Sequence, residues 1–138
     1  MADIGKLIEF NTSCSPAFVQ RAGVAAITEG EPTVAATRAR FRHARDRLIA
    51  DLQGLPGVQA ATPKGAMYAL FRIAGVNDSL AFCKRLVADA GLGLAPGSAF
   101  GPDGEGFVRW CFAASDERLA EGVARLGRFL DSRRERAA

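Results

Sequence analysis

Apolar residues recur with helical spacing near the N-terminus, where they predict a first helix from Ile4, Leu7 and Ile8. The polar run 11–15 ends this pattern. Ser15 followed by Pro16 is typical of a helix N-cap with proline at the first helical position. A second helix is therefore predicted from this point until Gly30 interrupts it.

A longer helix is predicted to follow Pro32. At about 100° per residue, its apolar side chains fall within one stripe, formed by Val34, Phe41, Leu48, Ile49 and Leu52. This stripe is the expected core face of the helix.

The pattern changes to that of strands after the turn at 54–57, and strands are predicted over 58–61, 67–73, 92–95 and 107–113. A helix that begins at Asp78 or Ser79 and ends at Gly91 separates the second and third strands. Ser115 is expected to cap a last helix. The order of elements predicts an α/β (α+β) fold: a small mixed sheet with helices mainly on one face, preceded by N-terminal helices.

The composition is that of an ordinary globular domain. The chain has 138 residues, of which 49% are hydrophobic and 24% charged, which excludes intrinsic disorder and a collagen-like fibre. No run of residues approaches the roughly 18 consecutive apolar positions of a membrane span, and the N-terminus lacks the features of a secretory signal. Cys14, Cys83 and Cys111 form no CxxC pair, which favours free thiols and a cytoplasmic location.

Metal binding and nucleophilic catalysis find little support in the sequence. His43 is the one histidine, and it stands among arginines in a predicted helix rather than among other ligands. The spacings between the three cysteines match no zinc motif. No metal site and no catalytic nucleophile are expected.

Five arginines fall between residues 38 and 47, in a chain of net charge +3, and such a cluster is one signal of a nucleic-acid interface. Their helical angles divide them between opposite sides, with Arg38, Arg42 and Arg45 on one and Arg40 and Arg47 on the other. No aromatic ladder accompanies them. A solvated helix is the favoured interpretation, and no nucleic-acid partner is expected.

The glycine-rich segment 96–106 matches neither of the common phosphate-binding patterns, GxGxxG and GxxxxGK[ST], and a strand rather than a helix follows it. It is interpreted as a flexible inter-strand loop that is able to line a pocket.

Arg109 is the most informative residue, because it lies within the nearly continuous apolar strand 107–113. Burying a lone guanidinium is costly, so such a residue usually has a carboxylate partner. One interpretation is an ion pair with an acid of this chain, such as Asp116. The other is that the planar guanidinium of Arg109 binds the carboxylate of a ligand through two parallel N–H bonds. The residues alone favour the ion pair.

Several segments, read in order, resemble the C-terminal small domain of fold-type I, pyridoxal-phosphate-dependent aminotransferases of class I/II, the aspartate aminotransferase-like family. The matching segments are 5–13, 16–23, 63–68, 90–101, 104–109 and 112–113. Together they extend over nearly the whole chain, and their ordered succession is more specific than any one of them.

The resemblance implies a role for particular residues. Arg109 matches the arginine that binds the α-carboxylate of the amino-acid substrate, and the loop 96–101 would lie near that substrate. The run 11–15 would lie near a dimer interface, which makes Asn11 and Thr12 candidate contacts to the cofactor of a neighbouring subunit. The implied reaction is amino transfer between an amino acid and a 2-oxo acid.

Pyridoxal phosphate requires a lysine for its Schiff base, an acid at the pyridinium nitrogen and donors for the phosphate. Lys6, Lys64 and Lys84 are the only lysines, and none stands in the serine-to-lysine motif of such enzymes. The resemblance places the cofactor lysine in a large domain that this chain lacks. No catalytic residue is therefore expected here, and no cofactor is expected to bind this chain alone.

The sequence therefore predicts two parts: an N-terminal helical segment, 1–31, that is the remnant of an interdomain contact, and a small domain over 32–138. The function hypothesis is a C-terminal domain or truncated product of an aminotransferase, catalytically incomplete by itself. The apolar residues of 1–30 would then lose their cover and drive self-association. A non-catalytic domain that binds amino acids or oxo acids through Arg109 remains the alternative.

Overall fold

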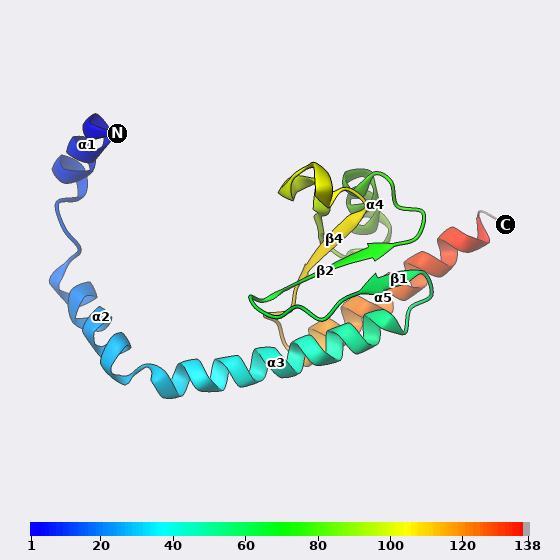
Figure 1. Ribbon diagram of the computed structural model, residues 1–138, viewed down its shortest axis with the longest axis horizontal. Coiled ribbons are helices and arrows are strands. Elements are labelled where there is room, and N and C mark those ends of the chain that lie inside the picture. Colours follow the sequence, from blue (N-terminus) through cyan, green and yellow to red (C-terminus); the bar gives the residue numbers. More distant parts are fainter. Residues whose placement is uncertain (137–138) are drawn as a thin grey trace. The chain divides into compact units, whose positions relative to one another are not determined.

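A computed structural model describes residues 1–136. The helices are α1 (Ala2–Thr12), α2 (Ala17–Glu29), α3 (Glu31–Gln53), α4 (Ser79–Ala90) and α5 (Asp116–Glu135). The strands are β1 (Val58–Ala60), β2 (Tyr68–Ile73), β3 (Ala95–Pro96) and β4 (Phe107–Cys111), and two short 3-10 helices are η1 (Gly97–Phe100) and η2 (Pro102–Gly104) (Figure 1).

The chain forms two compact units, Met1–Arg38 and a second that begins at Ala39. The boundary between the two units falls within α3. The predicted boundary after residue 31 lies at the start of that helix, and its meaning as a domain boundary stays a prediction. No helix within residues 1–136 combines the length and the apolar character needed to cross a membrane.

In the first unit, α1 and α2 have no buried residue. The predicted cap of α2 is wrong in detail, because Pro16 occupies the N-cap position and the helix begins one residue later, at Ala17. The backbone carbonyl of Ser15 accepts a hydrogen bond from Gln20 Nε2 at 2.7 Å, whereas the Ser15 side chain caps nothing.

In the second unit, a four-stranded sheet has the order β1-β2-β4-β3. All three pairings are antiparallel, so the predicted mixed sheet is wrong in that respect, although the α/β fold class is confirmed. The crossover from β2 through α4 to β3 does give two strands of the same direction. Because β4 is inserted between them and runs the opposite way, no parallel pair forms.

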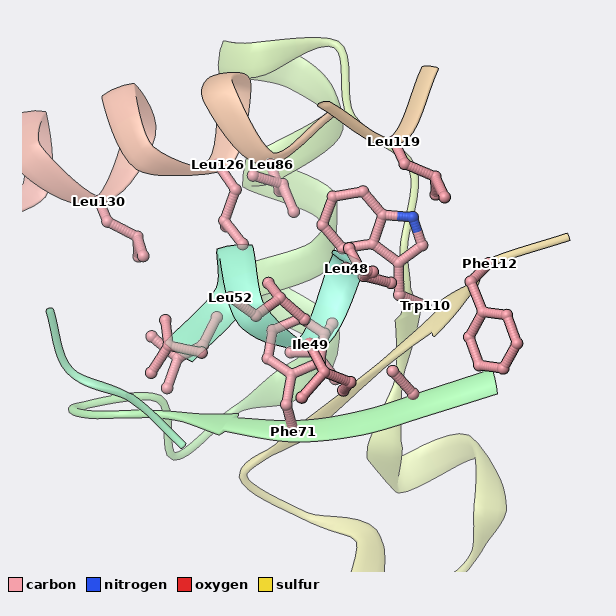
Figure 2. Packing of buried hydrophobic residues seen from close by; sticks show 14 of the residues in the cluster. Leu48, Ile49, Leu52, Phe71, Leu86, Trp110, Phe112, Leu119, Leu126 and Leu130 are labelled. Carbon is pink, nitrogen blue, oxygen red and sulfur yellow. The ribbon is translucent and has the colours of Figure 1, made fainter. Parts of the chain in front are cut away.

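Helices cover one face of this sheet. Figure 2 shows side chains of α3, α4 and α5 gathered over Phe71 of β2 and Trp110 of β4. Leu52, Leu86 and Leu126, one from each helix, are fully buried. The predicted core stripe of α3 is confirmed for Leu48, Ile49 and Leu52, but Val34 belongs to the first unit and is exposed.

The predicted helix ends in this unit are confirmed. Asp78 Oδ1 accepts from the backbone N–H of Ala81 at 2.8 Å at the start of α4, and Gly91 ends that helix in the left-handed conformation. The hydroxyl of Ser115 caps α5 by accepting from the Arg118 N–H. These caps set where the chain leaves each helix to enter the sheet or its loops.

Candidate functional site

The candidate site lies on the face of the sheet opposite the helices. Along β2, burial alternates from residue to residue, so Ala69, Phe71 and Ile73 are buried while Tyr68, Leu70 and Arg72 are exposed. In an antiparallel pair, residues directly opposite one another point to the same face. The register pairs Leu70 with Arg109, Tyr68 with Cys111 and Arg72 with Phe107, which places all six on this open face.

The guanidinium of Arg109 lies between two aromatic rings. Its Cζ is 3.9 Å from the centroid of the Phe100 ring and 4.3 Å from that of the Tyr68 ring. Both contacts are of the cation–π kind, which engages the flat faces of the guanidinium. The N–H donors lie in its plane and stay available to an acceptor that approaches from the edge.

Within residues 1–136, the Arg109 side chain has neither a hydrogen bond nor an ion pair. The predicted ion pair with Asp116 is wrong: Asp116 Oδ2 instead lies 3.1 Å from Arg47 Nη1 and 3.3 Å from His43 Nε2. The premise of that prediction fails as well, since Arg109 is half-buried rather than enclosed. Its charge therefore needs no acid from its own chain.

Phe100 is held in place by an anchored loop. The Glu105 carboxylate accepts from the backbone N–H of Ser79 at 2.7 Å and from that of Gly106 at 2.8 Å, and these bonds hold the pKa of Glu105 below its usual value. The Ser79 hydroxyl donates to Ser98 Oγ at 3.0 Å and accepts from the Ser98 N–H. The segment 96–106 is thus tied to the start of α4, unlike the flexible loop favoured from the sequence.

Arg72 is a second arginine on the open face. Its Cζ lies 4.2 Å from the centroid of the Phe107 ring, and within the described part of the chain its side chain has no ion pair. The face thus presents two guanidinium groups, and it is Arg109 whose guanidinium lies against the Tyr68 and Phe100 rings.

The remaining candidate residues lie outside the strands that form the open face. Lys6 is on α1, Lys64 on the loop before β2 and Lys84 on α4, and all three are exposed without a hydrogen bond or ion pair inside residues 1–136. The residues present therefore do not fit pyridoxal phosphate, which needs a lysine beside an acid and phosphate donors. Asn11 and Thr12 lie exposed at the end of α1, in the first unit.

The thiol of Cys111 lies on the open face, opposite Tyr68. Cys14 and Cys111 are exposed, Cys83 is buried, and burial raises the pKa of Cys83 to about 11. Among residues 1–136, no three His, Cys, Asp or Glu side chains are grouped to hold a metal ion.

The relatives and solved structures that this chain resembles in sequence and fold are aminotransferases. No protein-family model matches the chain. An aspartate aminotransferase of Thermotoga maritima is 35% identical over 94% of this chain, and an LL-diaminopimelate aminotransferase of Oleidesulfovibrio alaskensis is 32% identical over 91%. The crystal structure of an aromatic aminotransferase from Pyrococcus horikoshii matches with a TM-score of 0.84 and 31% identity, over 94% of this chain and 35% of its own.

The chain spans about a third of the length of the curated relatives that it matches, 32% for each of the two named above. The resemblance to the small domain of aminotransferases is thereby confirmed. Carboxylate binding by Arg109 and cofactor contacts by Asn11 and Thr12 stay predictions.

Sequence reasoning missed Tyr68 and Phe100 as the rings beside Arg109. Tyr68 ends one of the segments that carry the resemblance, but its position next to Arg109 depends on the register of β2 against β4. Phe100 reaches the site from η1, which no hydrophobic period marks. An alternation of polar and apolar residues along β4 would have indicated that one of its faces is open. Phe107 and Cys111 lie on the open face but are apolar, so the sequence of β4 does not show this alternation.

Proposed function

We propose that this chain is the small domain of a pyridoxal-phosphate-dependent aminotransferase, in which Arg109 binds the α-carboxylate of an amino acid or 2-oxo acid. The observation that supports it most is an arginine that contacts two rings on the uncovered face of the sheet and has no acidic partner among residues 1–136. Relatives and solved structures named as aminotransferases support the same proposal.

The chain's own residues account for carboxylate binding in simple terms. Tyr68 and Phe100 contact the guanidinium and restrict its orientation. A carboxylate then accepts two parallel N–H bonds from the edge of the fork, which fixes its orientation as well as its position. Each such charge-assisted bond contributes about 1.5–3 kcal/mol.

Amino transfer by the chain alone is not proposed, because its lysines do not fit the cofactor. Pyridoxal phosphate, supplied by the rest of an aminotransferase, would carry the amino group there. A second candidate, a non-catalytic domain that binds amino or oxo acids, is favoured by the same misfit of Lys6, Lys64 and Lys84. The two differ in affinity, since a dedicated binding domain has to hold its ligand without help from another domain.

Calorimetry and NMR titration of the full chain with a panel of amino acids and 2-oxo acids test the role of Arg109. We expect saturable binding near 1 mM, about 4 kcal/mol of binding free energy. Arg109→Gln should weaken it at least about tenfold, because the charged fork is lost. The affinity of Arg109→Lys should lie between that of the unmodified chain and that of Arg109→Gln, since lysine keeps the positive charge but lacks the planar guanidinium.

The matched control is Arg72→Gln, which removes an arginine from the same face but not from the pair of rings around Arg109. It should leave the dissociation constant within about twofold of the unmodified chain. Equal affinity in Arg109→Gln and in the unmodified chain would rule out the proposed site. Dissociation constants below about 1 μM would favour the dedicated binding domain.

Self-association through residues 1–30 is a second part of the proposal. Large apolar side chains of α1 and α2 are exposed, among them Leu7 at 69%, Phe10 at 89% and Phe18 at 73%. An apolar surface of this kind drives association between copies or with the missing part of an aminotransferase. We also propose a dimer in which Asn11 and Thr12 approach the neighbouring subunit's cofactor, and a reducing, cytoplasmic location in keeping with the free thiols.

Sedimentation velocity measures this association. We expect the weight-average sedimentation coefficient to rise with protein concentration, and Leu7→Glu to abolish the rise because it places a charge on the apolar side of α1. Glu9→Lys is the control, since two positions along an α-helix turn by about 200°, which places Glu9 on the side of α1 opposite Leu7. A concentration-independent monomer in the unmodified chain would contradict the proposal.

A further inference from the structure

A cavity of about 270 Å³ lies on the helical side of the second unit, between α4 and α5. It is lined by the loop 75–78, by Phe82 and Arg85 of α4, and by Phe129 and Arg133 of α5. No sequence motif marks this cavity, and its lining shares no residue with the open face that carries Arg109.

Two arginines from different helices are held over aromatic rings at this cavity. The Arg133 Cζ is 5.3 Å from the centroid of the Phe82 ring, and the Arg85 Cζ is 6.0 Å from that of Phe129. The two rings pack edge to face, with centroids 5.7 Å apart. Each guanidinium therefore reaches across to the ring of the other helix, which brings both positive charges to one pocket.

These charges are poorly compensated within residues 1–136. Arg133 has no hydrogen bond and no ion pair there, and its side chain is half-buried. Arg85 has Asp89 at 3.8 Å, but Asp89 lies one turn further along α4 and does not line the cavity. Asp78 does line it, and its Oδ1 already accepts the N–H of Ala81 as the cap of α4.

The positive charges near Arg133 repel its guanidinium. Burial, and then the neighbouring charges of Arg85 and Arg136, lower the pKa of the Arg133 guanidinium. A basic residue in the last turn of α5 is favourable to the helix dipole, which accounts for Arg133 alone. It does not account for Arg85, which lies in the middle of α4 and faces the same cavity.

We propose that this cavity binds a phosphate group, free or as the monoester of a small molecule. Two planar forks that meet at one pocket suit an acceptor with several oxygens and more than one negative charge. A phosphate monoester carries about −1.5 to −2 charges near neutral pH, more than the single charge of a carboxylate. The volume of about 270 Å³ leaves room for the group and a small organic portion beside the two rings that line the cavity.

NMR titration of the full chain at constant ionic strength tests the proposal, with inorganic phosphate and phenyl phosphate as probes. Both should bind saturably and shift the side-chain Nε–H signals of Arg85 and Arg133. Arg133→Gln and Arg85→Gln should each raise the dissociation constant at least about tenfold, because one charge-assisted contact is lost. Tighter binding of phenyl phosphate would identify a monoester as the ligand, and equal binding would identify the free anion.

Arg128→Gln is the matched control, because Arg128 is on α5, pairs with Glu121 at 3.7 Å and does not line the cavity. It should leave the dissociation constant within about twofold. Equal losses in Arg128→Gln and Arg133→Gln would show general charge attraction and overturn the proposal, as would a titration that does not saturate.

Thermal unfolding separates a binding role from a purely structural one. Phosphate should raise the Tm of the unmodified chain but not that of Arg133→Gln, since only a ligand of the folded state stabilises it. Without phosphate, Arg133→Gln should unfold at the same temperature or slightly higher, because repulsion with Arg85 is relieved. A lower Tm without phosphate, together with an unchanged phosphate response, would show a structural role and overturn the proposal.

Discussion

Replacing Gly97 with alanine is expected to lower the free energy of unfolding by about 3 kcal/mol or more, the upper end of what overpacking costs. A Cβ atom at this position would overlap the backbone carbonyl oxygens of Gly104 and Phe107. Backbone cannot rotate out of the way as the end of a flexible side chain can. The turn η1, the turn η2 and the start of β4 would have to separate.

The same substitution should weaken the candidate site, because Phe100 stands at the end of η1 and packs on Arg109. Urea denaturation measures the loss of stability, and titration with an amino acid measures the loss at the site. Gly93→Ala is the matched control: a Cβ there meets nothing within 4 Å, so its effect should stay below about 1 kcal/mol. Equal denaturation midpoints for Gly97→Ala and the unmodified chain would contradict the close approach of the two turns.

The helices of the second unit were predictable because their signals are local. The carboxylate of Asp78, the hydroxyl of Ser115 and the left-handed Gly91 each act within one turn of their own helix. The apolar stripe of α3 likewise predicted Leu48, Ile49 and Leu52 as core. Val34 continues that stripe and is nevertheless exposed, since periodicity shows which residues share a face and not whether another element covers it.

The environment of Arg109 could not be predicted from local pattern. Apolar side chains on both faces made 107–113 read as a buried strand, so an acidic partner such as Asp116 was expected for the arginine. Whether a face is covered depends on how the strands pair and where the helices pack. Tyr68 and Phe100 are 41 and 9 residues from Arg109 in the sequence. The register of β2 against β4 brings Tyr68 to Arg109, and the path of the loop that follows β3 brings Phe100 there.

The segment 96–106 shows a related limit of sequence reasoning. Its many glycines indicated flexibility, yet Gly97 and Gly104 are there because two backbone turns pack against each other without room for a Cβ. A glycine in a sequence is consistent either with a flexible loop or with two backbone segments in close contact. Which of these applies depends on a tertiary contact that the hydrophobic pattern does not indicate.

Phe71→Ala is expected to cost about 3–5 kcal/mol of unfolding free energy, since it removes a large side chain from a closed core. Phe71 has no exposed surface, and its ring centroid lies 6.4 Å from that of Trp110. That loss is a large part of the roughly 5–15 kcal/mol that stabilises a domain. Urea denaturation measures it, with the slope of the transition as a check that the unfolded state is unchanged.

Leu70→Ala, one residue earlier in β2, is the control that separates the two faces of the sheet. Leu70 points to the open face and is 44% exposed, so its replacement should cost no more than about 1 kcal/mol in the chain studied alone. If the two substitutions cost the same, the open face is covered in solution, and Arg109 beside Leu70 is not free to meet a ligand. Within a complete aminotransferase, where we propose that this face meets substrate and the rest of the enzyme, Leu70→Ala should affect substrate binding more than it affects the stability of this domain.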